Sequence, residues 1–165
     1  MPRKIFYSFH YSNDCWRTST VRSIGSIEGN KPAHDNDWEK VKSGGDDAIK
    51  KWIASQLNGR SCTVVLIGEK TSERRWIRHE INESWNAGMG VVGIYIHGLK
   101  NNEGYISNKG KNPFDNISFT SSGKKLSEVV KAYNPIGTNS QERYAWIAKH
   151  LSNALEEAIN IRKSF

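Results

Sequence analysis

Short apolar runs alternate with amphipathic stretches along this chain. Two runs, residues 62–67 (CTVVLI) and 91–96 (VVGIYI), are continuously apolar, which is typical of strands covered on both faces by helices. A third run, residues 4–9 (KIFYSF), is short and aromatic and leads into a polar turn. The pattern therefore predicts three buried strands, with residues 62–67 as the central one.

Helical periodicity fills the segments between these strands. A short, weakly amphipathic helix is expected at about residues 14–23, before a loop at 24–37 that is rich in Gly, Asn, Pro and Asp. A helical pattern begins at residue 38, is interrupted by the glycine pair 44–45, and stops at Asn58-Gly59.

Polar residues mark the expected starts of two helices. Asp46 or Asp47 is expected to cap the restarted helix, and Thr71 or Ser72 to cap the next one, at residues 74–87. The glycines at positions 88 and 90 are expected to end that helix.

In the last third of the chain, the pattern of apolar and polar residues predicts the secondary structure less clearly. A long polar loop is expected from residue 98 to about 125, and loops of that length are often functional. Residues 126–133 (LSEVVKAY) are interpreted as a last strand, with a helical turn as the alternative. Asn139 and Glu142 resemble a capping box at the start of a final amphipathic helix.

Strands that alternate with helices predict the α/β class. We expect a flavodoxin-like three-layer sandwich with a central parallel sheet, formed by a single domain over residues 1–165. Ligands of such sheets bind outside the carboxyl ends of the strands. The loops after Phe9, Ile67 and Ile96 are therefore the candidate sites.

Composition and charge narrow the class of partner. The 165 residues carry a net charge of +7, so an anionic partner is more plausible than a cationic one. Cys15 and Cys62 are too few for a disulfide scaffold and are interpreted as buried thiols. No apolar window is long enough to span a bilayer and no leader-like segment opens the chain, so we expect a cytoplasmic protein that does not interact with membranes.

Most catalytic motifs are missing from the sequence. No GxGxxG or GxxxxGK[ST] loop follows a strand, which disfavours dinucleotide oxidoreductases and P-loop enzymes. The chain has no GxSxG elbow, and its five histidines lack metal-ligand spacing. We therefore expect neither a bound metal nor a catalytic triad.

One pair of residues suggests a role in substrate binding and catalysis. Trp76 and Glu80 lie one helical turn apart, so an indole and a carboxylate share one face. Trp76 could stack on a pyridinium ring while Glu80 orients ribose hydroxyls and stabilises positive charge at the anomeric carbon. Arg74 or Arg75 could help to hold a phosphate. The alternative is a chance pair, with Glu80 as a solvent-facing carboxylate.

Longer stretches resemble a known family. The segment Ile5-Phe6-Tyr7-Ser8-Phe9, followed by Asn13-Asp14, is similar to the first strand and loop of TIR domains. Further segments resemble the bacterial TIR-like family that includes the signal-producing component of the Thoeris anti-phage system: GNK at 29–31, DWE at 37–39, VVLIG at 64–68, RW at 75–76, HEI at 79–81, GIYIH at 93–97 and KGKNPF at 109–114. The resemblance covers about residues 3 to 160.

The resemblance implies an NAD-consuming enzyme that cleaves the bond between nicotinamide and ribose. It implies NAD as substrate with no other cofactor, a cyclic ADP-ribose-type signal, and a separate effector reached by that signal. Self-assembly or a phage-derived trigger would activate it. Carried over by position, Glu80 would be the catalytic carboxylate, and the substrate would lie against Ser8, Phe9, Asp37, Trp38 and Trp76.

Two other functions stay open at this point. The first is a non-catalytic TIR-like adaptor or sensor that works through assembly. The second, nucleic-acid binding, has only the positive charge in its favour, without a basic stripe that interleaves with aromatic residues.

Other side chains have plain structural interpretations. Trp52, Trp85 and Trp146 are expected in the core, His10 and His97 are interpreted as polar loop residues, and the lysines between positions 100 and 125 as a solvated loop.

Overall fold

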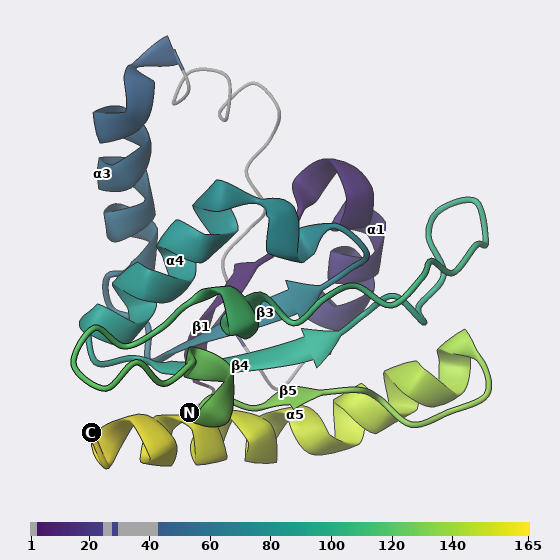
Figure 1. Ribbon diagram of the computed structural model, residues 1–165. Helices are drawn as coiled ribbons and strands as arrows, with labels where there is room; N and C mark the ends of the chain where they lie inside the picture. The colour runs from purple at the N-terminus through teal and green to yellow at the C-terminus, as the bar shows by residue number, and fades with distance from the viewer. Residues whose placement is uncertain (1–2, 25–27, 30–42) are drawn as a thin grey trace.

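The computed structural model describes residues 3–24, 28–29 and 43–165, and Figure 1 shows a sheet between two layers of helices. The strands are β1 (Lys4–Ser8), β2 (Glu28–Gly29), β3 (Cys62–Ile67), β4 (Gly90–Tyr95) and β5 (Ala132–Tyr133). The α-helices are α1 (Tyr11–Arg22), α3 (Gly45–Leu57), α4 (Arg75–Asn86) and α5 (Ser140–Lys163). Short 3₁₀ turns are η1 (Thr71–Glu73), η2 (Pro113–Asn116) and η3 (Leu126–Glu128).

All strand pairs in the described part of the chain are parallel, in the order β2-β1-β3-β4-β5. Every residue of β3 and β4 is buried, because both faces of the sheet are covered. The predicted α/β sandwich and the central position of residues 62–67 are confirmed. Strand β2 was missed, since its two residues fall inside the segment interpreted as a loop.

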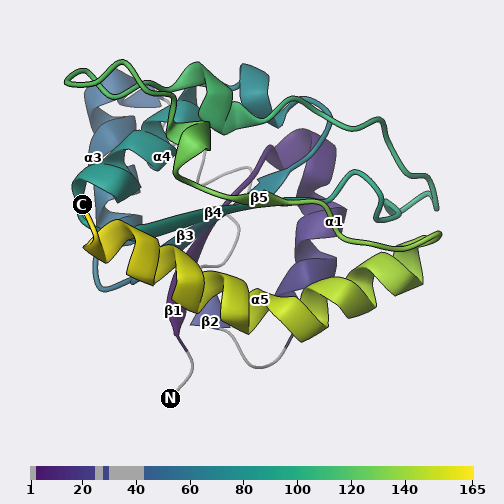
Figure 2. The same ribbon diagram turned by 60° about the horizontal axis from the view of Figure 1, so that its bottom comes forward.

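Two helices cover each face of the sheet. Helices α1 and α5 pack with one set of strand side chains, and α3 and α4 pack with the other. Figure 1 shows α3 and α4 together on one side, and Figure 2 shows α5 running along the opposite face. The side on which a strand residue lies therefore decides which helices it can reach.

Two predicted caps are wrong. Helix α3 begins at Gly45 with Gly44 as its N-cap, so Asp46 and Asp47 lie in the first turn, where their charges still suit the helix dipole. The Thr71 hydroxyl lies next to the turn after β3, 2.8 Å from the backbone N of Gly68, from which it accepts a hydrogen bond, and α4 has Arg74 at its N-cap.

Other helix ends follow the sequence more closely. Helix α1 begins three residues earlier than expected, at Tyr11. Gly88, at φ +81°, follows the end of α4, whereas Gly90 is the first residue of β4. The side chain of Asn139 caps α5 by accepting from the Glu142 backbone N at 2.8 Å, as predicted. The capping box is not closed, because Glu142 Oε2 accepts from the Thr138 backbone N instead of that of Asn139.

Residues 126–133 contain both of the structures weighed from the sequence. Residues 126–128 form the 3₁₀ turn η3, and pairing with β4 is confined to Ala132 and Tyr133. The strand favoured for the whole segment is therefore wrong over residues 126–131. Leu126 and Val130 are buried with α4 instead of pairing in the sheet.

The polar segment from 98 to 125 packs closely on the sheet. In Figure 1 it returns across the sheet on the side of α4. Phe114 of η2 is fully buried against Val65, Ile67 and Ile77. Phe114 thus anchors the segment in the core on that face, while the lysines between positions 100 and 125 are exposed, as predicted.

Several side chains differ from the expected burial. Trp52, Trp85 and Trp146 pack against the core, as predicted, although each keeps some exposure. Cys62 is buried, whereas Cys15 is only partly so. Among the described residues, no helix is both long enough and apolar enough to cross a membrane.

Candidate functional site

Glu80 reaches from α4 to the carboxyl end of β1. The hydroxyl of Ser8, the last residue of β1, donates a hydrogen bond to Glu80 Oε2. Side chains alternate along a strand, so Phe6 and Ser8 point to the α3 and α4 side while Ile5 and Tyr7 point to the α1 and α5 side. The register of β1 therefore directs the Ser8 hydroxyl at α4.

Burial changes the acidity of this carboxyl group. It raises the pKa of Glu80 to about 7, because the charged form is poorly solvated there, and the hydrogen bond from Ser8 acts in the opposite direction. A carboxyl with a pKa near neutrality exists in both forms at cellular pH and can exchange a proton during a reaction. Such a group in a strand-end site is a functional candidate on physical grounds.

A buried pair of hydroxyls holds the backbone of Glu80 against the sheet. Ser84 Oγ donates to the carbonyl oxygen of Glu80 at 2.6 Å and lies 2.7 Å from Thr63 Oγ1. Because Ser84 uses its proton for that carbonyl, Thr63 of β3 donates to Ser84. This link from β3 to α4 was missed, since neither residue belongs to a recognisable motif.

Trp76 is enclosed by neighbours on α3 and α4. Its indole packs against the cluster that contains Phe6, Ile49 and Ile53. The Arg75 guanidinium lies over the ring at 4.4 Å, and the His79 ring meets its edge at a centroid distance of 5.5 Å. With Arg75 over its ring and His79 at its edge, the indole is suited to line one side of a binding site rather than to offer an open ring on which a substrate can stack.

The cations at the start of α4 have separate surroundings. Arg75 forms an ion pair with Asp46 of α3 at 2.6 Å, so the charge of Arg75 is already compensated. Arg74 lies near His10, whose pKa is lowered first by burial and then by the Arg74 charge. Of the two arginines suggested for phosphate binding, Arg74 is therefore the one that lies near the carboxyl end of β1.

Phe9 lies on the other side of the sheet. It continues the alternation of β1 and packs with Ile5 and Tyr7 against the α1 and α5 layer. The structure therefore brings Ser8 and Glu80 together and places Phe9 on the opposite face. Asp37 and Trp38 lie outside the described residues.

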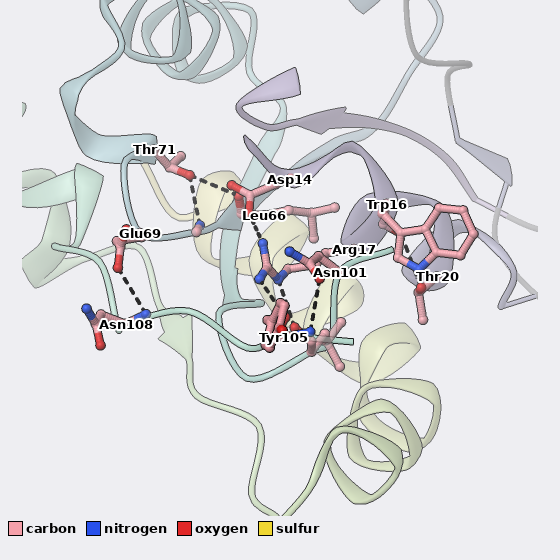
Figure 3. Close-up of polar contacts among 12 residues, drawn as sticks. Asp14, Trp16, Arg17, Thr20, Leu66, Glu69, Thr71, Asn101, Tyr105 and Asn108 are labelled. Atoms are coloured by element: carbon pink, nitrogen blue, oxygen red, sulfur yellow. Dashed lines mark hydrogen bonds and ion pairs between the residues drawn. The ribbon is translucent and has the colours of Figure 1, made fainter. Parts of the chain in front are cut away.

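A buried ion pair organises the loops around this edge. Asp14 and Arg17 of α1 are 0% and 3% exposed and meet at 3.1 Å. Arg17 also donates to the carbonyl oxygens of Leu99 at 2.8 Å and Tyr105 at 3.1 Å, as Figure 3 shows in part. In the sequence Asp14 stands out only as a position that matches the TIR pattern, and no local signal indicates its pairing with Arg17.

The same carboxylate also contacts the loop after β3. A Cβ atom at Gly68 would lie 2.0 Å from Asp14 Oδ2, so only glycine fits there. Further along, Glu69 accepts from the Asn108 backbone N at 3.1 Å (Figure 3). The loops after β1, β3 and β4 thus form one connected edge.

A parallel sheet covered by helices, with a partly buried carboxylate at the carboxyl edge, defines a flavodoxin-like α/β domain of the TIR-like class. More narrowly, the chain belongs to the family described as "Thoeris protein ThsB, TIR-like domain", whose model matches residues 6–101.

The similarity to a curated protein covers more of the chain than the family model does. The curated protein is 38% identical over 133 residues, which cover 76% of this chain and 69% of the relative. That protein, from Bacillus cereus (strain MSX-D12), is named "Putative cyclic ADP-D-ribose synthase ThsB1". The resemblance to the Thoeris TIR-like family is confirmed.

Proposed function

We propose that this chain consumes NAD by cleaving the bond between nicotinamide and ribose, and that it makes a cyclic ADP-ribose-type signal for a separate effector in anti-phage defence. The observation that carries the proposal is the Glu80 carboxyl group, held by Ser8 at the carboxyl edge of the sheet with a pKa of about 7. The name of the Bacillus cereus relative supports the same substrate and product class.

The chemistry follows from how an N-glycosidic bond breaks. The electron pair of the bond goes to the ring nitrogen of nicotinamide, which leaves as a neutral molecule while positive charge develops at C1′ of the ribose. An ionised Glu80 stabilises that charge, and the poorly solvated surroundings make this interaction stronger than it would be in water. Attack by a nucleophile within the ADP-ribose part, either an adenine nitrogen or a ribose hydroxyl, closes a cyclic product, whereas attack by water gives ADP-ribose; each route releases one proton.

The neighbours of Glu80 have distinct roles in this proposal. Ser8 holds the carboxylate and favours its ionised form, and Trp76 forms a wall of the site. Arg74 supplies positive charge near the end of β1. NAD is the substrate, and the proposed reaction uses no other cofactor. Activation by self-assembly or by a phage-derived trigger belongs to the same proposal.

Replacement of the carboxylate tests the proposal. Glu80→Gln keeps the size of the side chain and removes the negative charge, so nicotinamide release from NAD should fall by about a hundredfold or more. The matched control is Glu83→Gln, the same change on the same helix, which should retain activity. The measurement is mass spectrometry of nicotinamide, ADP-ribose and cyclic ADP-ribose isomers made by the purified proteins.

The same pair of variants should be compared in cells with and without phage infection. We expect the cyclic product only with the wild-type chain and with Glu83→Gln. If Glu80→Gln turns over NAD as fast as the wild type, the proposed role of Glu80 is wrong. If no variant consumes NAD even in infected cells, the chain acts instead as an adaptor through assembly.

A further inference from the structure

His97 lies just beyond β4 in an unusual environment for a loop histidine. It is 9% exposed, and its Nδ1 atom is buried without a hydrogen-bond partner among the described residues. The sequence alone suggests a polar loop residue at this position. Buried ring nitrogens normally take part in a hydrogen bond, so an unpaired one points to a hydrogen-bond partner outside the described chain.

A second unpaired polar atom lies on the adjacent backbone segment. Ser107 donates its backbone N–H to the carbonyl oxygen of His97 at 2.9 Å. Its Oγ is also buried and has no partner within residues 3–24, 28–29 and 43–165. Two donors thus lie on neighbouring segments with nothing in the described chain to accept from them.

Two cations flank His97 from different elements. The Arg143 side chain of α5 packs against Gly98, where a Cβ would lie 1.7 Å from a guanidinium nitrogen. Lys109 Nζ lies 4.7 Å from the centre of the Tyr95 ring, and that ring meets His97 edge-on at a centroid distance of 6.0 Å. Glycine at position 98 therefore allows the guanidinium to approach the end of β4.

The charges around His97 are positive. Its pKa is lowered first by burial and then by Arg143, Lys109 and Arg17. Neither Arg143 nor Lys109 forms an ion pair in the part of the chain that the structure describes. Three carboxylates of the surrounding segments already have partners. Asp14 pairs with Arg17, and Glu69 accepts from the Asn108 backbone (Figure 3). Asp115, which acts on Tyr95, accepts from Ser127 Oγ at 2.5 Å.

We propose that His97, Ser107, Lys109 and Arg143 form a binding site for a phosphoryl anion. The hydroxyl and the imidazole N–H would donate hydrogen bonds to phosphoryl oxygens, and the two cations would neutralise their charge. β4 lies two strand spacings from β1, about 10 Å, so this site is distinct from the Ser8–Glu80 pair. Its existence does not depend on NAD cleavage.

The anion has two possible sources, a free ion or the diphosphate of a nucleotide, and three probes separate them. The histidine ring signals of the wild-type protein are followed by NMR at fixed pH and ionic strength, with His97→Gln used for assignment. Inorganic pyrophosphate, ADP-ribose and nicotinamide riboside are added in turn. Phosphoryl binding should shift the His97 signals and raise its pKa, because a bound anion favours the charged ring.

Each pattern of response has a meaning. A shift with both phosphorylated probes, but not with nicotinamide riboside, supports the site. A shift with pyrophosphate alone identifies a free anion, and one with ADP-ribose alone identifies a nucleotide. No shift with either phosphorylated probe, or an equal shift with nicotinamide riboside, overturns the proposal, whatever the outcome for Glu80.

A pair of lysine variants controls for general charge effects. Lys109→Ala should weaken pyrophosphate or ADP-ribose binding about tenfold or more, since it removes one of the two positive charges that neutralise the bound anion. Lys124→Ala makes the same change at an exposed position of the same loop and should leave binding within about twofold. Equal losses in the two variants would mean non-specific attraction to a basic protein and would overturn the site.

Discussion

At the scale of single residues, Glu80 lies at the carboxyl edge of the sheet, where ligands of such sheets bind, but its surroundings disfavour the charged form of its carboxyl group. Its carboxyl group ionises less readily than that of an ordinary glutamate because burial penalises the charge, and the Ser8 hydroxyl donates a hydrogen bond to it. A residue that destabilises the folded chain when charged is typical of active sites, where function rather than stability sets the environment.

This environment predicts a pH-dependent stability. In the unfolded chain Glu80 loses its proton near pH 4.5, and in the folded protein near pH 7. Between these values the folded state binds more protons, so this group makes the protein less stable as pH rises from 4.5 to 7. The full effect is about 3 kcal/mol at most, from a pKa difference of roughly 2.5.

Glu80→Gln isolates the contribution of this group. The free energy of unfolding of the variant, minus that of the wild type, should increase between pH 4.5 and pH 8, measured by urea denaturation at each pH. Glu73→Gln, at an exposed position just before α4, should show a nearly constant difference. A constant difference for Glu80→Gln as well would mean that its pKa is not raised.

At the scale of secondary structure elements, the placement of α4 on β3 determines where Glu80 lies. The Thr63 and Ser84 hydroxyls connect the two elements, and the Ser84 hydroxyl holds the Glu80 carbonyl. The far end of α4 is held by α5, because Arg162 Nε donates to the Trp85 carbonyl at 2.9 Å and its guanidinium lies over the Trp85 ring. Both contacts lie in the last turn of α4, after Glu80, so they fix the C-terminal part of the helix to β3 and to α5.

Thr63→Val tests the connection between β3 and α4. Valine keeps the shape of threonine but removes the donor to Ser84, so stability should fall by about 1 kcal/mol. NAD turnover should fall as well, because the Glu80 carbonyl is held less firmly, whereas the pH dependence of turnover should stay unchanged because Ser8 still donates to the carboxylate. Ser55→Ala, at an exposed position of α3, is the control for loss of a hydroxyl. Unfolding in urea and the pH–rate profile are the measurements.

At the scale of the whole molecule, three strand-end loops meet at one edge through the Asp14–Arg17 pair. The pair is buried, and the guanidinium also binds the backbone of the segment after β4 at Leu99 and Tyr105. Buried ion pairs add little net stability, yet removal of one partner leaves an uncompensated charge. The pair is thus an organising contact for the edge that carries both candidate sites.

Arg17→Met should destabilise the protein by about 3 kcal/mol or more, because Asp14 would keep a buried charge. Hydrogen exchange should increase first in residues 99–107, whose backbone Arg17 holds. The double variant Asp14→Asn with Arg17→Met should recover part of the loss, since no buried charge then remains. Equal stability of the single and double variants would contradict this account.

The sequence by itself determined the fold class and the main candidate. Apolar runs predict β3 and β4, and the local resemblance around Ser8 and Glu80 identifies the family and the carboxylate, because these signals are short range. The tertiary structure decided the rest. It showed that Phe9 lies across the sheet from Ser8, that Trp76 is partly covered by Arg75, and that His97 is buried. Burial and pKa depend on contacts between residues far apart in the chain, and no local pattern contains them.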